Sequence, residues 1–79
     1  MSLNDLRQIV AGVLEVEPEQ LTPETDLRQF DTFDSVNVLN LMMTLNIEAN
    51  IQMSPADAQN LRQFGDLIRL AEKQGIALQ

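Results

Sequence analysis

The first apolar pattern of the chain has the spacing of an amphipathic helix that begins after Ser2. Leucine, isoleucine and valine recur every three or four positions up to residue 14, which places them on one face of a helix. Asp5, three residues after Ser2, completes a capping pattern at the start. Pro18 disfavours a helical conformation at Glu17, so the pattern predicts that this helix ends between residues 14 and 16.

The following segment, residues 16–33, has neither the helical nor the strand period. It contains two prolines, three threonines and several acids. It is longer than most connections inside a compact domain, and such loops are often held down by their own side chains. We expect three apolar side chains to anchor this long loop to the core: Leu21, Leu27 and Phe30.

The most hydrophobic stretch is a second predicted helix over residues 36–49, with Asp34 or Ser35 as its N-cap. At about 100° per residue, its larger apolar residues fill a broad arc, with Leu39 at the margin. We assign this arc to the core: Val38, Leu41, Met42, Leu45 and Ala49. A second apolar stripe lies beyond Leu39 and consists of Val36, Met43 and Ile47. A polar strip completes the helix surface, formed by Asn37, Asn40, Thr44 and Glu48.

This helix is more apolar than one buried face requires. Two explanations of the second stripe stay open. Either a neighbouring loop covers it, or it is a surface on which a partner protein docks, with Met43 as an adaptable contact.

Two further helices are predicted in the last third of the chain. Ser54, followed by proline and by Asp57, starts a short helix over residues 55–60. A last helix over residues 65–74 begins beside Phe64, and Gly75 fits a left-handed C-cap. The predicted fold is therefore all-α: a four-helix bundle with three longer helices, a short third helix and a long loop between helices one and two. Its predicted core comprises Leu6, Val10, Val13, Leu27, Leu41, Met42, Leu45, Leu61, Leu67, Ile68 and Ala71.

Length and composition restrict the chemistry of this bundle. Seventy-nine residues suit one domain, which we expect to span residues 1–79, to be monomeric and to lack a deep, enclosed active site. The chain has no cysteine and no histidine, so it lacks a thiol, the usual general base near neutral pH and two common metal ligands. We therefore expect a protein that is not an enzyme. The lack of cysteine is compatible with a reducing, cytoplasmic location.

The charge of the chain is strongly negative, with a formal net charge of -7. This argues against binding to nucleic acid. Either the acidity favours basic protein partners, or it serves only solubility. Seven of the twelve acids lie between residues 15 and 34, but without the alternation and the glycine turn of a calcium loop. We expect a solvated acidic rim and no metal site. No signal peptide and no apolar run of about 20 residues is present, so we expect no membrane insertion.

Ser35 is the candidate for chemistry, because it stands between an acidic cap residue and the start of the apolar helix. A hydroxyl at a helix N-terminus lies beside unpaired backbone N–H groups, so a phosphate esterified to it would be favourably placed. No neighbouring residue type would activate this hydroxyl for catalysis. Ser35 is therefore predicted to be an attachment point that another protein modifies.

The order of elements and three motifs resemble the acyl carrier protein family, which includes aminoacyl and peptidyl carriers. Residues 21–27 are similar to the loop that precedes the modified serine in many carriers. Asp34-Ser35-Val36 resembles the Asp-Ser-Leu of the family, and the Phe-Gly-Asp-Leu of residues 64–67 falls where the last helix begins. The resemblance covers residues 3–75, nearly the whole chain.

The resemblance implies that Ser35 carries 4'-phosphopantetheine, which a separate phosphopantetheinyl transferase installs from coenzyme A. The thiol of this arm would hold acyl groups as thioesters for partner enzymes of fatty acid or secondary metabolism. Asp34 would help the transferase to recognise the site, and Val36, Met43 and Ile47 would meet partner enzymes. Two alternatives remain, namely an aminoacyl or peptidyl carrier and an unmodified helical interaction module.

Several positions depart from the family pattern. Typical carriers place acids along the second helix, whereas asparagine and isoleucine occupy four such positions here: Asn37, Asn40, Asn46 and Ile47. This predicts a specialised carrier whose docking depends more on the apolar stripe and the loop acids, with partners that present basic or apolar surfaces. Thr32 replaces a common glycine and leaves its loop less permissive.

Ala49 replaces an aromatic residue that is frequent in the family. Either Phe30 or Phe33 refills the core there, or a cavity for cargo remains. An apolar cargo is hypothesised to lie between helices two and three, near Met42, Leu45 and Leu61.

Overall fold

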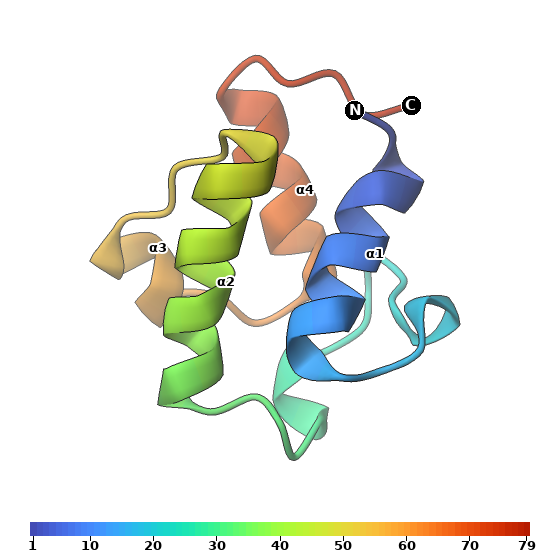
Figure 1. The fold of residues 1–79 in the computed structure, drawn as a ribbon, viewed down its shortest axis with the longest axis vertical. Helices are drawn as coiled ribbons and strands as arrows, with labels where there is room; N and C mark the ends of the chain where they lie inside the picture. Colours follow the sequence, from blue (N-terminus) through green and yellow to red (C-terminus); the bar gives the residue numbers. More distant parts are fainter.

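The computed structural model describes residues 1–79 and consists of helices and loops. Its elements, in chain order, are α1 (Leu3–Leu14), the 3-10 helices η1 (Pro18–Gln20) and η2 (Leu27–Gln29), α2 (Ser35–Ala49), α3 (Pro55–Gln59) and α4 (Phe64–Lys73). The three longer helices pack around one core, and the short α3 lies beside α2 (Figure 1). The predicted all-α bundle, with three longer helices and a short third, is confirmed.

Side-chain caps fix the starts of three helices. The Ser2 hydroxyl accepts from the Asp5 N–H at 3.0 Å, and the Ser54 hydroxyl accepts from the Asp57 N–H at 3.1 Å. The N-cap of α2 is Asp34, so Ser35 is the first helical residue. These bonds satisfy N–H groups that a helix start leaves without a partner.

The ends of three predicted helices shift by one residue. α2 begins at Ser35 instead of residue 36, and α4 ends at Lys73 instead of residue 74. α3 ends at Gln59 instead of residue 60. α4 begins at Phe64 instead of residue 65, and the side chain of its N-cap residue, Gln63, makes no capping hydrogen bond. Two backbone N–H groups at this start donate to the long loop instead, as described below.

One hydrophobic cluster forms the core. Eight predicted members are buried: Leu6, Val10, Leu27, Leu41, Leu45, Leu61, Leu67 and Ala71. Five other side chains assigned to the core are only half-buried: Val13, Val38, Met42, Ala49 and Ile68. All of them except Val38 pack against the core from its edge. A small domain has too little interior to bury every apolar side chain of its helix faces. Ile51 and Met53, in the connection after α2, are buried although they were not assigned to the core.

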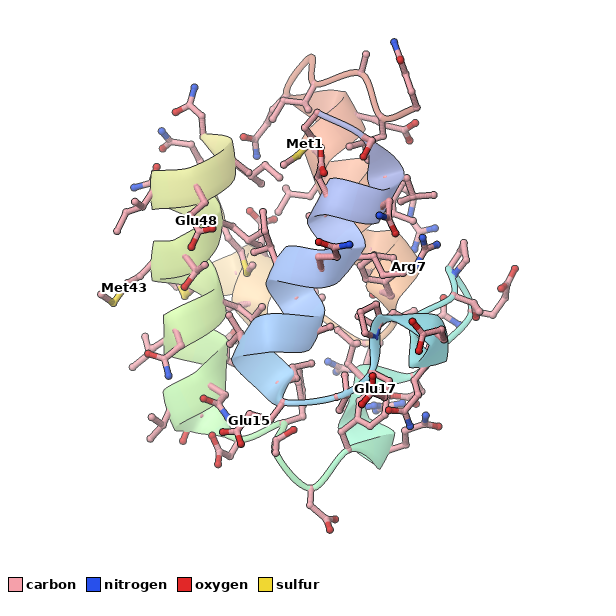
Figure 2. All side chains as sticks on the ribbon, turned by 45° about the vertical axis from the view of Figure 1, so that its right-hand side comes forward. Met1, Arg7, Glu15, Glu17, Met43 and Glu48 are labelled. Carbon is pink, nitrogen blue, oxygen red and sulfur yellow. The ribbon has the colours of Figure 1, made fainter.

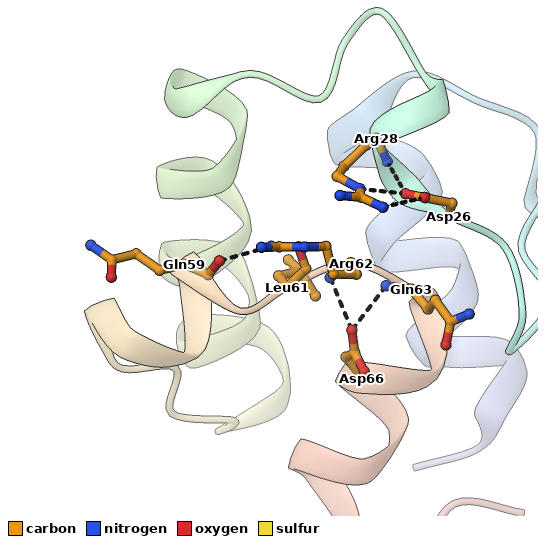
Figure 3. Close-up of polar contacts among 7 residues, drawn as sticks. All are labelled: Asp26, Arg28, Gln59, Leu61, Arg62, Gln63 and Asp66. Carbon is orange, nitrogen blue, oxygen red and sulfur yellow. Dashed lines mark hydrogen bonds and ion pairs between the residues drawn. The ribbon is translucent and has the colours of Figure 1, made fainter.

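The long loop is fastened to α4 and α1 by hydrogen bonds to its backbone. The N–H groups of Phe64 and Gly65 donate to the Thr25 and Pro23 carbonyls at 3.0 and 2.9 Å. The Leu27 N–H donates to the carbonyl of Arg62 at 2.8 Å. Asp66 in turn accepts from the Arg62 and Gln63 N–H groups, both at 2.9 Å (Figure 3).

Apolar anchors hold the same loop from inside. Leu21 and Leu27 are fully buried, and Phe30 is half-buried against the core, which confirms the three predicted anchors. The Arg7 side chain of α1 donates through Nε to the Leu21 carbonyl at 2.8 Å. The segment before α2 is therefore fixed at several points along its length.

The two chain ends meet at one end of the molecule. The Leu3 N–H donates to the Gln79 carbonyl at 2.9 Å. The start of α2 lies at the opposite end along the long axis, which measures 31 Å (Figure 1). None of the helices combines the length and the hydropathy that crossing a membrane requires.

Candidate attachment site

The site is the first turn of α2. Ser35 is exposed, and its hydroxyl takes part in no hydrogen bond. The Asp34 carboxylate accepts from the Asn37 N–H at 2.9 Å, and the Asp34 carbonyl accepts from the Val38 N–H at 2.9 Å. The N–H groups of Ser35 and Val36 donate to no protein acceptor. A free hydroxyl thus lies beside two free donors at the positive end of a helix of 15 residues.

The segment that precedes Ser35 is held at Thr32. The Thr32 hydroxyl donates to the carbonyl of Leu14, the last residue of α1, at 2.5 Å. The Asn37 side chain donates through Nδ2 to the Thr32 carbonyl at 2.8 Å. Thr32 therefore joins the end of α1 to the first turn of α2.

The predicted second stripe of α2 is exposed. Four apolar side chains in this region have most of their surface open to solvent: Val36 at 65%, Leu39 at 58%, Met43 at 60% and Ile47 at 78%. Figure 2 shows the Met43 side chain pointing away from the body of the protein. The explanation that a neighbouring loop covers the stripe was therefore wrong.

Leu39 belongs to this surface, although it was placed only at the margin of the core arc. The helical spacing indicates that Leu39 shares a face with the stripe, because Leu39 follows Val36 by three residues and precedes Met43 by four. We call Val36, Leu39, Met43 and Ile47 the exposed stripe. The exposed Asn40 lies on the same helix, where its side chain donates to the Asn37 Oδ1 at 3.0 Å. Glu48 is the single charged residue of α2.

An open groove of about 410 Å³ begins at Ser35 and runs between α2 and α3. Its lining residues are Ser35, Val38, Leu39, Met42, Pro55, Ala58 and Gln59. None of them carries a charge. Of the three residues at which cargo was hypothesised to lie, only Met42 lines this groove, because Leu45 and Leu61 are buried in the core. Ala49 is half-buried against the core and lines no pocket, so a cargo cavity at this position is not found.

The side chains of the site do not form a catalytic or metal-binding arrangement. No group of three or more aspartate or glutamate residues converges as metal ligands would. The carboxylate nearest to Ser35 in sequence, that of Asp34, accepts from the backbone of the helix that it caps. The site therefore presents a nucleophilic oxygen without a general base, which suits modification by a second protein.

Comparison with known proteins identifies the class. The family model described as "Phosphopantetheine attachment site" matches residues 4–71, and the chain belongs to this family. It is similar to the acyl carrier protein of Wolinella succinogenes, with 29% identity over 69 residues that cover 87% of this chain and 91% of the relative. The acyl carrier protein of Helicobacter pylori is 29% identical over 73 residues, which cover 92% of this chain and 94% of the relative.

As a member of the acyl carrier protein family, the chain is a non-catalytic carrier with covalently attached 4'-phosphopantetheine. Its family interacts with phosphopantetheinyl transferases and with enzymes that handle acyl groups. The first turn of α2 fits this group, because an exposed hydroxyl lies beside free N–H donors and opens onto an apolar groove. When bound, the arm supplies the thiol that the sequence lacks.

Proposed function

We propose that Ser35 is the residue that bears the 4'-phosphopantetheine arm. One comparison within the chain supports this proposal. The sequence contains three serines, and the hydroxyls of Ser2 and Ser54 each accept a backbone N–H as helix caps. Only the Ser35 hydroxyl is exposed and without a hydrogen bond. Its oxygen is therefore the one that a transferase can reach without breaking a helix cap.

Intact mass spectrometry tests this assignment. The apo-protein is incubated with coenzyme A, magnesium and a permissive phosphopantetheinyl transferase, and we expect the mass to increase by one arm. Ser35→Ala should gain none, whereas Ser54→Ala, which loses only a cap worth about 1 kcal/mol, should gain one. An arm on Ser35→Ala, or none on the wild type with a competent transferase, would contradict the proposal.

We propose further that the exposed stripe, flanked by Asn40, docks partner enzymes through apolar contact, and that Asp34 contributes to recognition by the transferase. Four neighbouring apolar side chains are exposed on a helix whose only charge is Glu48. Such a surface offers little to a strongly basic partner and suits a partner with an apolar docking patch. This supports a specialised carrier in a lipid or secondary-metabolite pathway.

Adding acids to α2 tests the docking proposal. We expect Asn40→Glu with Asn46→Glu to increase turnover of this carrier by a general fatty-acid synthase enzyme, because a basic docking surface would then find opposite charges. The control is Gln79→Glu, which adds an acid at the chain end, opposite the first turn of α2, and should leave turnover unchanged. If the double variant is no better a substrate than the wild type, docking does not depend on the charge of α2.

The groove favours a fatty-acyl cargo over an aminoacyl one. Its walls are apolar and carry no charged side chain that could pair with an amino group. Acylation of the holo-protein should shift the NMR signals of Val38, Met42 and Ala58 and leave those of α1 unchanged. Unchanged signals at these three residues would mean that the chain stays outside the groove.

We also propose that residues 1–79 act as one monomeric domain in the cytoplasm. A single hydrophobic cluster and the lack of cysteine support this proposal. Light scattering of the holo-protein should give the mass of one chain, and the mass of a dimer would contradict it.

A further inference from the structure

We propose that Thr32 and Asn37 are positioning residues for the modification of Ser35. They fasten the segment before α2 to α1 and to the first turn of α2, and so determine where the Ser35 hydroxyl lies when the transferase docks. The inference rests on the proposed attachment at Ser35.

Thr32 makes hydrogen bonds to residues that precede Ser35 in the chain and to one residue that follows it. Its hydroxyl donates to the Leu14 carbonyl, which is an otherwise open carbonyl at the C-terminal end of α1. Its own carbonyl accepts from the Asp34 N–H at 3.0 Å and from the Asn37 Nδ2 at 2.8 Å. One residue thereby joins the end of α1 to the first turn of α2, and Ser35 lies in the span between these bonds.

Asn37 can play its part only as an amide. Its Oδ1 accepts from the Asn40 side chain, which leaves its Nδ2 to donate to Thr32. An aspartate in this place would present two acceptor oxygens and would bring a negative charge against the Thr32 carbonyl. The bond between α2 and the preceding segment therefore depends on the nitrogen of the Asn37 side chain.

The Ser35 side chain makes no hydrogen bond that could fix its position. Its hydroxyl is free, and its N–H donates to no protein group. The orientation of the hydroxyl is therefore determined by the bonds on either side of it. A displacement of about 1 Å at a reacting atom can reduce a rate on the order of 100-fold. Loosening Thr32 should thus slow transfer of the arm while the exposed stripe, whose side chains take no part in these bonds, still binds the transferase.

The test is the steady-state kinetics of arm transfer to apo-protein from coenzyme A. Thr32→Val preserves the shape of the side chain and removes the hydroxyl, so we expect kcat to fall on the order of 10-fold with KM nearly unchanged. Thr32→Ser retains a hydroxyl and should restore most of the rate. Asn37→Asp and Asn37→Ala should both slow transfer, and because only the first adds a charge, a shared loss identifies the missing amide as the cause.

Thr44→Val is the matched control, because Thr44 is, like Thr32, a half-buried threonine, but it lies further along α2 and its hydroxyl makes no hydrogen bond. It should transfer the arm at the wild-type rate. All variants are compared at a temperature at which circular dichroism shows each to be folded, and the amide shifts of Ser35 and Val36 report whether the first turn has moved.

Three results would overturn the inference: a wild-type kcat for Thr32→Val, a Thr32→Ser variant as slow as Thr32→Val, or an equal loss in Thr44→Val. A failure of the proposed attachment looks different, because then Ser35→Ala would still gain the arm or the wild type would gain none.

Discussion

At the scale of single residues, three helices are followed by a residue whose backbone adopts the left-handed conformation. The three residue types tolerate this conformation unequally. Glu15 ends α1 at φ 57°, Asn50 ends α2 at φ 54°, and Gly75 follows α4 at φ 86°. In each case the next N–H reaches back to a carbonyl of the last turn, as Val16 does to Ala11 at 3.1 Å. Glycine adopts this conformation freely and asparagine tolerates it, whereas glutamate is strained.

Glu15→Gly should therefore stabilise the protein. We expect the free energy of unfolding to increase by about 1 kcal/mol, because relief of left-handed strain and removal of a negative charge from a helix C-terminus outweigh the added freedom of the unfolded chain. Urea denaturation measures it. Asn50→Gly, where little strain exists, should change the stability by only a few tenths of a kcal/mol; a Glu15→Gly variant no more stable than wild type would contradict this account.

At the scale of elements, the start of α4 and the long loop are built as one unit. Gly65 lies so close to the loop that a Cβ on it would approach the Pro23 carbonyl oxygen to 2.7 Å. The same residue donates its N–H to this carbonyl at 2.9 Å. A side chain at this position would therefore push apart the elements that hold the segment leading to Ser35.

We expect Gly65→Ala to lower the free energy of unfolding by about 1–3 kcal/mol, as overpacking against a backbone atom does. Amide exchange at Leu27, whose N–H bonds to the Arg62 carbonyl, should accelerate with it. Gly12→Ala is the matched control, because a Cβ there meets nothing within 4 Å and should stabilise α1 by up to about 1 kcal/mol. Equal stability of the two variants would show that the close approach is harmless.

The elements also show how far the sequence could predict the fold. The starts at Ser2 and Ser54 follow from local capping, and local signals were sufficient there. The start of α4 was placed one residue late because its first N–H groups find partners in a loop about 40 residues away, which no local pattern contains. Ile51 and Met53 were not assigned to the core because a connection without a period gives no signal of burial.

The candidate site likewise combines features that the sequence indicated with features that only the structure shows. The sequence placed Ser35 at the start of the second helix and identified the second stripe by its spacing, but it left open whether Asp34 or Ser35 is the N-cap and whether a loop covers the stripe. The contact between Thr32 and Leu14 could not be predicted, because 18 residues and a folded loop separate them. Ser35 was thus singled out from the sequence as the candidate for the arm and stays a prediction, whereas the contacts that hold it in place required the structure.

At the scale of the whole molecule, negative charge is poorly compensated. The net charge is -7, and the only ion pairs, Arg28 with Asp26 and Arg69 with Asp66, are local and at the surface. The Arg28 side chain and N–H lower the pKa of Asp26 to about 2. The pKa of Asp66 is also below its ordinary value: partial burial raises it, but the bonds from the Gln63 and Arg62 N–H groups and from Arg69 outweigh that effect.

Acid should therefore destabilise the fold in a defined range. The folded protein binds a proton at Asp26 more weakly than the unfolded chain does, so this stabilisation is complete above about pH 4 and is lost as the pH falls toward about 2. Between these values, the free energy of unfolding should fall more steeply for the wild type than for Asp26→Asn. For Asp31→Asn, which removes an equal charge from a carboxylate without hydrogen bonds, the free energy of unfolding should fall as steeply as for the wild type. Identical slopes for all three proteins would contradict the lowered pKa of Asp26.

The meeting of both chain ends at one pole, opposite the first turn of α2, has a practical consequence. A peptide tag, a surface anchor or a fused neighbour joined to either end would emerge from the same place and leave Ser35 facing outward. Immobilised carriers tethered through residue 1 or residue 79 should thus be equally good targets for an incoming transferase, and a linker of a few residues should suffice in both orientations.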